Sequence, residues 1–297
     1  MKITFKKFLM LSFIVGGAFY GTAQTKEQRE RIIKNYDLNA LKELSTKFET
    51  EFFEKKAKAE SLAKINNWPL SYSKEGSYAE LMDVTEEGNP IYYSTYNVGS
   101  ALTSRANHLQ PGGSLGLNLT GSGMYVGVWD GKYPRTSHVD FVGRFTTQDG
   151  PGTQLENHPT HVLGTIIGAG AQNANAKGIA SEAYGYINDF NNDMGEMTLQ
   201  ASFGLLLSNH SYGPVAAGLP AYFFGAYTGN SRSVDLLTFN APSYQPVVAA
   251  GNDGDGNYDH LTSMATAKNT IVVAAVNQVS NYTGASSVSL AGFSSWG

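Results

Sequence analysis

The chain has 297 residues, a formal net charge of −4 and no cysteine. A hydrophobic content of 41% with only 15% charged residues indicates a globular protein, long enough for one large domain or two ordinary ones. The slight negative charge gives no electrostatic basis for binding nucleic acid or an anionic membrane. Without cysteine, the chain has no disulfide, no thiolate metal site and no cysteine nucleophile.

The N-terminus has the pattern of a secretory signal peptide. Basic Lys2, Lys6 and Lys7 precede the apolar stretch 8–20, which is short for a membrane span. Small residues follow, so we predict cleavage after Ala23 and a secreted protein, periplasmic or extracellular. The alternative is an N-terminal membrane anchor. No later stretch reaches the roughly 18 apolar residues of a spanning helix, so no further membrane contact is expected.

Residues 24–105 are expected to form either a prosegment or an N-terminal extension that docks on the following domain. In the charge-rich part, 26–64, apolar residues recur at helical spacing and predict an amphipathic helix: Leu41, Leu44, Phe48 and Phe52. Residues 65–120 are rich in Tyr, Ser, Gly and Asn, which favours loops and short extended pieces. The main domain is therefore predicted to occupy 106–297.

From residue 121 onward, short apolar runs alternate with glycine-containing helical stretches. The candidate buried strands are 124–129, 183–187, 204–207, 246–250 and 271–275. Continuous apolar strands are typical of a parallel sheet covered by helices on both faces. In such α/β sheets, ligands bind just past the carboxyl ends of the strands. Polar motifs follow several of these candidate strands, so we expect a functional site at that edge.

Two of these motifs contain candidate catalytic residues. Asp130 ends the first strand, where its carboxylate either points into a cleft or caps a turn. In segment 156–168, Pro159 suits the start of a helix, which places His158 at the helix entrance and His161 one turn later. Zinc proteases place their two histidines four apart, with a glutamate after the first. The spacing here is three, so a metal site is the weaker interpretation and His161 is also consistent with a structural histidine.

A third motif follows the strand 246–250, where Asn252 lies in a tight Gly-Asn-Asp-Gly segment. Its amide could donate a hydrogen bond into the same cleft, although the segment is also good turn chemistry. His158 follows Asp130 after a short interval, and Asn252 lies much further downstream. The order along the chain is therefore a strand with Asp, a helix with His, and a strand with Gly-Asn.

Six blocks in this order resemble the successive signatures of subtilisin-like serine peptidases, the subtilases: VGVWDG, NHPTHVLGTIIG, KGIASEA, SNHSYG, VVAAGNDG and GFSSWG. The resemblance covers roughly residues 120–297. It implies a subtilisin-like three-layer α/β fold with a mostly parallel central sheet, incomplete at the C-terminus and preceded by the helical extension.

The resemblance also implies residue roles. Asp130 matches the carboxylate that orients the imidazole, and His158 matches the general base. Asn252 matches the amide that helps to bind the oxyanion. Ser211, Tyr212 and Gly213 match the segment whose backbone pairs with a substrate strand. The order Asp, His, Ser along the chain belongs to this family of serine hydrolases.

The chain departs from the family pattern at two positions beside these residues. Pro159 replaces the usual glycine and is expected to bias His158 towards extended backbone. Gly131 and Lys132 replace the usual Thr/Ser-Gly pair, so a hydroxyl that normally supports the carboxylate is missing. Both departures bear on catalytic efficiency more than on family identity.

The family's nucleophile lies in a Gly-Thr-Ser-Met-Ala block downstream of the FSS segment, so we expect it beyond Gly297. Thr262-Ser263-Met264-Ala265 spells most of that block, but Ser263 follows Asn252 too closely to leave room for the intervening strands. We therefore predict that Ser263 is a surface loop residue. The 297-residue polypeptide itself is expected to be inactive.

The function implied is a monomeric, secreted serine endopeptidase that hydrolyses polypeptide substrates without a required cofactor. The family resemblance allows a structural calcium near Asp253, Asp255 and Asp259, although a solvated acidic loop is the simpler interpretation. Two alternatives stay open: a non-catalytic pseudoprotease or binding module, and a metal-dependent hydrolase that uses His158, His161 and nearby acids.

Overall fold

The structure is a computed structural model that describes residues 25–74, 77–95, 104–172, 174–254, 260–279 and 281–297. The predicted signal peptide therefore lies outside the described residues. The described part contains a six-stranded sheet and a four-stranded sheet. None of its helices is long and apolar enough to cross a bilayer.

The six-stranded sheet has the order β10-β9-β7-β4-β6-β5, and every neighbouring pair is parallel. Its strands are β4 (Tyr125–Asp130), β5 (Phe145–Thr147), β6 (Tyr184–Asp189), β7 (Leu207–His210), β9 (Gln245–Ala249) and β10 (Ile271–Val273). The predicted parallel sheet is confirmed. One predicted strand, 204–207, is misplaced, because these residues lead into β7, which begins at Leu207. The short β5 was missed because its residues are not buried and carry no apolar run.

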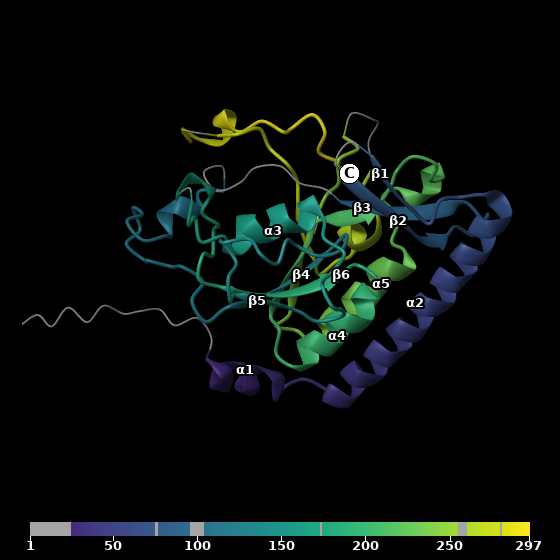
Figure 1. The fold of residues 1–297 in the computed structure, drawn as a ribbon, viewed down its shortest axis with the longest axis horizontal. Helices are drawn as coiled ribbons and strands as arrows, with labels where there is room; N and C mark the ends of the chain where they lie inside the picture. Colours follow the sequence, from purple (N-terminus) through teal and green to yellow (C-terminus); the bar gives the residue numbers. More distant parts are fainter. Residues whose placement is uncertain (1–24, 75–76, 96–103, 173, 255–259, 280) are drawn as a thin grey trace, which may run out of the picture.

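Helices cover both faces of this sheet, which makes three layers (Figure 1). Helix α3 (Asn157–Ile167) packs into one core with Val126 and Val128 of β4. Helices α4 (Asp193–Ser202) and α5 (Gly229–Asn240) contribute to a second core with Trp129. Successive strand residues point to opposite faces, so β4 supplies both cores.

The described part of the N-terminal segment folds as two helices and three strands. These are α1 (Lys26–Ile33), α2 (Leu38–Asn66), β1 (Ser71–Lys74), β2 (Ser77–Val84) and β3 (Pro90–Thr95). The predicted amphipathic helix is confirmed as α2, whose apolar stripe packs against α4 and α5 (Figure 1). The short extended pieces predicted here are confirmed as the antiparallel strands β1, β2 and β3, with a register shift between Leu81 and Asp83. Apolar side chains of β2 and β3, among them Leu81 and Ile91, are buried in the cores of the protein.

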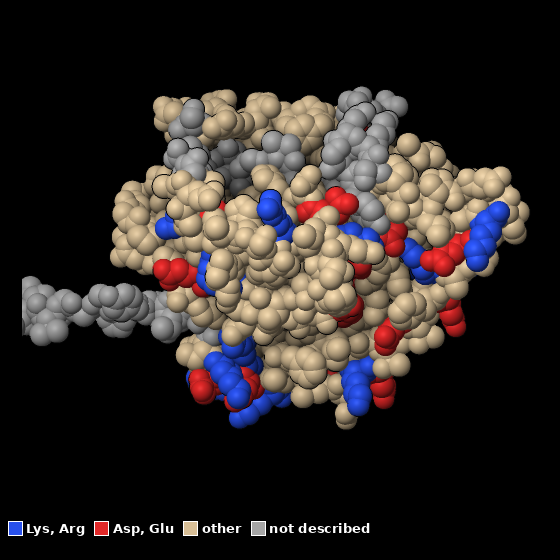
Figure 2. Space-filling model, in the orientation of Figure 1, with Lys and Arg blue, Asp and Glu red and all other residues tan. Residues whose placement is uncertain are grey.

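The four-stranded sheet has the order β1-β2-β3-β8, in which β8 (Tyr212–Pro214) comes from the main domain. The two parts of the chain are thus joined through a shared sheet. Short 3-10 turns complete the described part of the chain: Ala106–His108, Ala174–Ala176, Ala221–Phe223, Ser263–Thr266 and Ala285–Ser287. Figure 2 shows that, on this face, the charged side chains gather mainly along the rim where α1 and α2 lie.

Candidate active site

Asp130 and His158 form a close pair at the end of β4. The imidazole Nδ1 of His158 lies 2.8 and 2.9 Å from the two carboxylate oxygens of Asp130. A carboxylate only accepts hydrogen bonds, so Nδ1 carries the proton and donates it. The backbone N–H of Gly131 also donates to Asp130 Oδ1 at 2.7 Å. This backbone donor supports the carboxylate where the family pattern has a hydroxyl.

The first turn of α3 is tied to the chain that follows β4. The N–H of Glu156 donates to the carbonyl of Tyr133 at 2.9 Å, and the N–H of Arg135 donates to Thr160 Oγ1 at 2.8 Å. Pro159 is buried in this turn, where its missing N–H needs no partner. These contacts position the helix start, and with it the histidine that faces Asp130.

The prediction that Pro159 biases His158 towards extended backbone is wrong. His158 is the second residue of α3 and has helical and not extended backbone. The bias before proline is overcome here because helix packing and the bonds to Tyr133 and Arg135 fix the first turn. The departure at 159 therefore leaves the Asp130–His158 pair intact.

Asp130 is fully buried, and the side chain of His158 is 10% exposed. Burial raises the pKa of the Asp130 carboxyl, while His158 and the Gly131 N–H act in the opposite direction by stabilising its charged form. For His161, which lies on the exposed side of α3, desolvation lowers the imidazole pKa and His158 adds to that effect. The Asp130 carboxylate is thus screened from water, and Nε2 of His158 is also buried in this structure.

The register of the sheet places the other candidate residues at the same edge. Trp129 of β4 pairs with His210 of β7, and His210 pairs with Val248 of β9. Ser211 follows His210 at this edge, and the loop with Asn252 follows β9, one strand further on. This is the carboxyl-end edge where the sequence predicted a site.

Asn252 is exposed, in a loop that is braced by the C-terminal FSS segment. The N–H of Asp253 donates to Ser295 Oγ at 3.0 Å, and the N–H of Gly254 donates to the carbonyl of Phe293 at 2.9 Å. Ser294 and Ser295 are each 1% exposed. The Asn252 side chain thus projects from a loop whose backbone is fixed.

Strand β3 of the N-terminal segment occupies the edge formed by Ser211–Gly213. It runs antiparallel to β8, with Thr95 opposite Tyr212 and Ser94 opposite Gly213. The ring of Tyr93 is 8% exposed and lies 6.0 Å from the ring of Tyr212. The backbone that the sequence assigned to a substrate strand is therefore paired with the protein's own chain.

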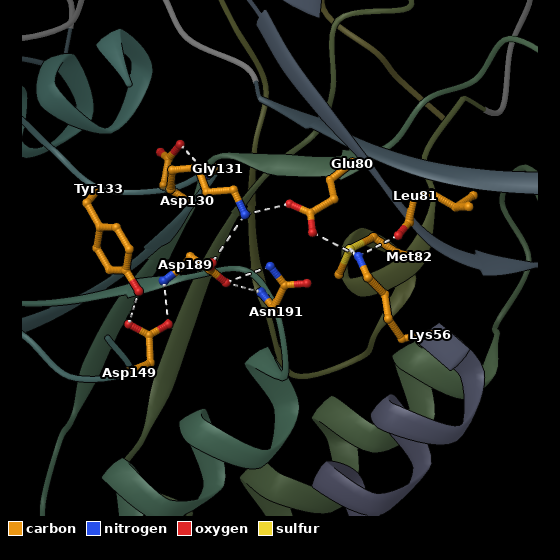
Figure 3. A network of polar contacts seen from close by, with 11 residues as sticks. Lys56, Glu80, Leu81, Met82, Asp130, Gly131, Tyr133, Asp149, Asp189 and Asn191 are labelled. Carbon is orange, nitrogen blue, oxygen red and sulfur yellow. Dashed lines mark hydrogen bonds and ion pairs between the residues drawn. The ribbon is translucent and has the colours of Figure 1, made fainter. Parts of the chain in front are cut away.

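Lys132 lies two residues after Asp130 and joins the main domain to Glu80 of β2. Figure 3 shows Glu80 and its neighbour Lys56. Its Nζ is 2.7 Å from Glu80 Oε2 and 3.5 Å from Asp189 Oδ2. Lys56 of α2 binds the other oxygen of Glu80 at 2.9 Å and the carbonyl of Leu81 at 2.6 Å. Burial raises the pKa of Glu80, but the bonds from Lys132 and Lys56 outweigh burial and hold the pKa below its usual value. The positive and negative charges of this cluster are matched.

Lys132 also has a left-handed backbone, with φ of +75°. This conformation costs a non-glycine residue about 1 kcal/mol, so the turn after Asp130 depends on contacts that hold it. The ion pairs of Lys132 are such contacts. The sequence identified Lys132 as a departure but gave no signal for Glu80 or Lys56, because neither forms a local motif with it.

The prediction that Ser263 is a surface loop residue is wrong. Ser263 is 4% exposed and begins a 3-10 turn with φ of +53°. Its Oγ accepts a hydrogen bond from Asn230 Nδ2 at 3.1 Å. The turn packs against α5 and β9, so tertiary contacts bury a sequence that looks like a loop.

The described residues contain no group of three His, Cys, Asp or Glu side chains that could hold a metal ion. Asp253 belongs to the described part, but Asp255 and Asp259 of the predicted acidic loop lie outside it. His158 directs its Nδ1 at Asp130, which is the arrangement of a hydrogen-bonded acid–base pair. Within the described part, the metal-dependent alternative therefore lacks a set of ligands.

Comparison with known proteins agrees with this geometry. The family model for the subtilase family, Peptidase_S8, matches residues 82–297, and the chain belongs to that family. The fold is accordingly subtilisin-like, and the family supports a serine peptidase. No curated protein matches the chain.

Two similar solved structures are themselves described as proteases. The patellamide maturation protease PatA is 24% identical, with 59% of this chain and 62% of that chain covered and a TM-score of 0.44. A cold adapted subtilisin-like serine proteinase is 18% identical, with coverage of 61% and 62% and a TM-score of 0.41. The chain thus spans about three fifths of the length of these solved structures.

Proposed function

We propose that the protein is a secreted serine endopeptidase that hydrolyses polypeptides through a Ser-His-Asp mechanism. The observation that carries the proposal is the 2.8 Å contact between His158 Nδ1 and Asp130, located at the carboxyl ends of a parallel sheet in a subtilase. The serine is expected downstream of Gly297. A monomer without a required cofactor is consistent with this chemistry.

The proposed reaction is acyl transfer to the serine. With the proton on Nδ1, the lone pair of neutral His158 is on Nε2, the atom that accepts the proton of the attacking hydroxyl. Asp130 stabilises the imidazolium that forms, and it keeps the ring in this tautomer. The amide of Asn252 would donate to the oxyanion, a contribution typically worth about 100- to 1000-fold in rate. The proton of His158 then passes to the leaving amine.

We further propose that residues 24–105 act as a prosegment that blocks the site before removal. The support is the pairing of β3 with β8, because β3 takes the backbone edge that a substrate strand would need. The packing of α2 on α4 and α5 adds a second attachment. The alternative, a permanent extension, requires that β3 leave this edge while the rest stays docked.

The decisive experiment is to sequence the gene beyond the codon for Gly297 and to express its whole product. We expect an open frame, a Gly-Thr-Ser-Met-Ala-like block and hydrolysis of casein that a serine-directed reagent stops. His158→Ala should abolish hydrolysis, whereas His161→Ala, one turn along the same helix, should retain most of it. A stop codon directly after Gly297, or an open frame with no hydrolysis, would instead support the non-catalytic binding module.

A further inference from the structure

A buried chain of hydrogen bonds runs behind the Ser211–Gly213 edge. The hydroxyl of Tyr244 lies 2.6 Å from Ser208 Oγ, and Ser208 Oγ lies 2.7 Å from His210 Nε2. Nδ1 of the same histidine lies 3.0 Å from the Tyr212 hydroxyl, which donates to Asp193 Oδ2 at 2.7 Å. Ser208, His210, Tyr212 and Tyr244 are all at most 3% exposed.

The proton positions along this chain have one consistent arrangement. Tyr212 gives its proton to the hydrogen bond with the Asp193 carboxylate, so its oxygen must accept the Nδ1 proton of His210. Burial lowers the pKa of His210 to about 3, so the imidazole is neutral and its Nε2 accepts from Ser208. Ser208 in turn accepts from Tyr244. Every donor in the chain then faces an acceptor.

These hydrogen-bonded side chains hold the segment Ser211–Gly213, which has little other support from the sheet. The backbone leaves the six-stranded sheet at His210 and joins the four-stranded sheet at Tyr212, with only Ser211 between them. Among the described residues, β8 pairs with β3 and with no other strand. When β3 gives way to another strand, the edge must keep its position through side chains, and Tyr212 is a fully buried aromatic anchor within it.

The same series of hydrogen-bonded side chains contacts β4, the strand that ends in Asp130. The ring of Trp129 stacks on His210 with centroids 5.3 Å apart and an interplanar angle of 18°. Trp129 directly precedes Asp130, and its Nε1 donates to Glu196 of α4 at 2.9 Å. Asp193 is the first residue of the same helix. Helix α4 thus fixes both the strand that ends in Asp130 and the peptide-pairing edge.

We propose that Tyr212 is a positioning residue, whose hydroxyl, held between His210 and Asp193, keeps the Ser211–Gly213 edge in register for the strand that binds there. The bound strand is β3 in this structure, and it is a substrate peptide if the proposed function holds. The Tyr212 hydroxyl is hydrogen-bonded to His210 and Asp193, so we expect it to act on strand binding and not on the chemical step.

Amide hydrogen exchange of the 297-residue chain tests the proposal without any assumption about catalysis. The reporter is the amide of Val215, which donates to the carbonyl of Tyr92 at 2.6 Å and therefore reports on the β3–β8 contact. Tyr212→Phe should raise its exchange rate about tenfold or more, as expected when a buried hydrogen bond to a carboxylate is lost. Tyr244→Phe is the matched control, because it removes an equally buried hydroxyl outside the contact with Asp193.

Asp193→Ala provides a second route to the same result. It removes the acceptor and leaves the Tyr212 hydroxyl in place, so Val215 exchange should rise as it does in Tyr212→Phe. The Val215 exchange rate in the double variant should be no higher than in either single variant, because both substitutions remove the same Tyr212–Asp193 contact. Equal Val215 exchange in Tyr212→Phe and Tyr244→Phe would overturn the proposal, as would full additivity in the double variant.

Kinetics of the whole gene product extend the test to substrate. Tyr212→Phe should raise KM for a peptide about tenfold and leave kcat within about twofold, since the hydroxyl supports binding alone. A fall in kcat with KM unchanged would overturn the positioning role. Absence of any peptidase activity would instead contradict the proposed function, on which the substrate part of the inference rests, and the exchange experiment would then decide the inference alone.

Discussion

Glu80→Gln is the substitution that tests how the N-terminal segment is held to the main domain. It keeps the size of the side chain and removes the charge that Lys132 and Lys56 share at 2.7 and 2.9 Å (Figure 3). The side chains of all three residues are only 13–15% exposed, so water compensates little. The substitution leaves two ammonium groups facing one neutral amide.

The expected loss follows from this geometry. Removal of one partner from a buried ion pair costs about 3–5 kcal/mol because the remaining charge is desolvated without compensation. Lys132 keeps Asp189 at 3.5 Å, and Lys56 keeps the carbonyl of Leu81. We therefore expect Glu80→Gln to lower the free energy of unfolding by about 2–3 kcal/mol.

The assay is urea unfolding at neutral pH of the wild type, Glu80→Gln, Lys132→Met and the double variant. The double variant should lose clearly less free energy of unfolding than the sum of the two single losses, since Glu80 and Lys132 are in direct contact. Glu30→Gln is the control, because the Lys26–Glu30 pair is 78% and 55% exposed and such pairs contribute little. A loss below about 0.5 kcal/mol for Glu80→Gln, or simple additivity, would refute the reasoning.

Three further predictions concern packing, pH and the buried serine. Gly254→Ala would drive a Cβ into the carbonyl oxygen of Ser294 and should cost about 2–3 kcal/mol by denaturant unfolding, whereas Gly292→Ala meets nothing within 4 Å and should be neutral. Burial raises the pKa of Glu196 to about 9, so its contribution to stability is present below the unfolded value of 4.5 and is lost as pH rises to about 9. Between these pH values, the free energy of unfolding of Glu196→Gln should therefore decline less steeply than that of the wild type. An equally steep decline would contradict the raised pKa of Glu196. Ser263→Ala should lower stability by about 1 kcal/mol and leave hydrolysis by the whole gene product within about twofold, and loss of hydrolysis would identify Ser263 as a functional residue.

The sequence by itself determined most strands of the parallel sheet and the two residues that pair in the candidate site. Apolar runs before Asp130 and before Asn252 predicted buried parallel strands, because strands covered on both faces must be apolar throughout. The position of His158 at a helix start followed from Pro159 and from the family pattern. These signals are local, and each element carries its own part of the pattern.

Only the tertiary structure decided how the N-terminal segment meets the rest of the chain. The pairing of Thr95 with Tyr212 and the ion pair between Glu80 and Lys132 both join positions far apart in the sequence. Ser263, which looked exposed, is buried by the same kind of long-range contact. Strand pairing, ion pairing and burial depend on which surfaces meet, and local sequence specifies a surface but not its partner.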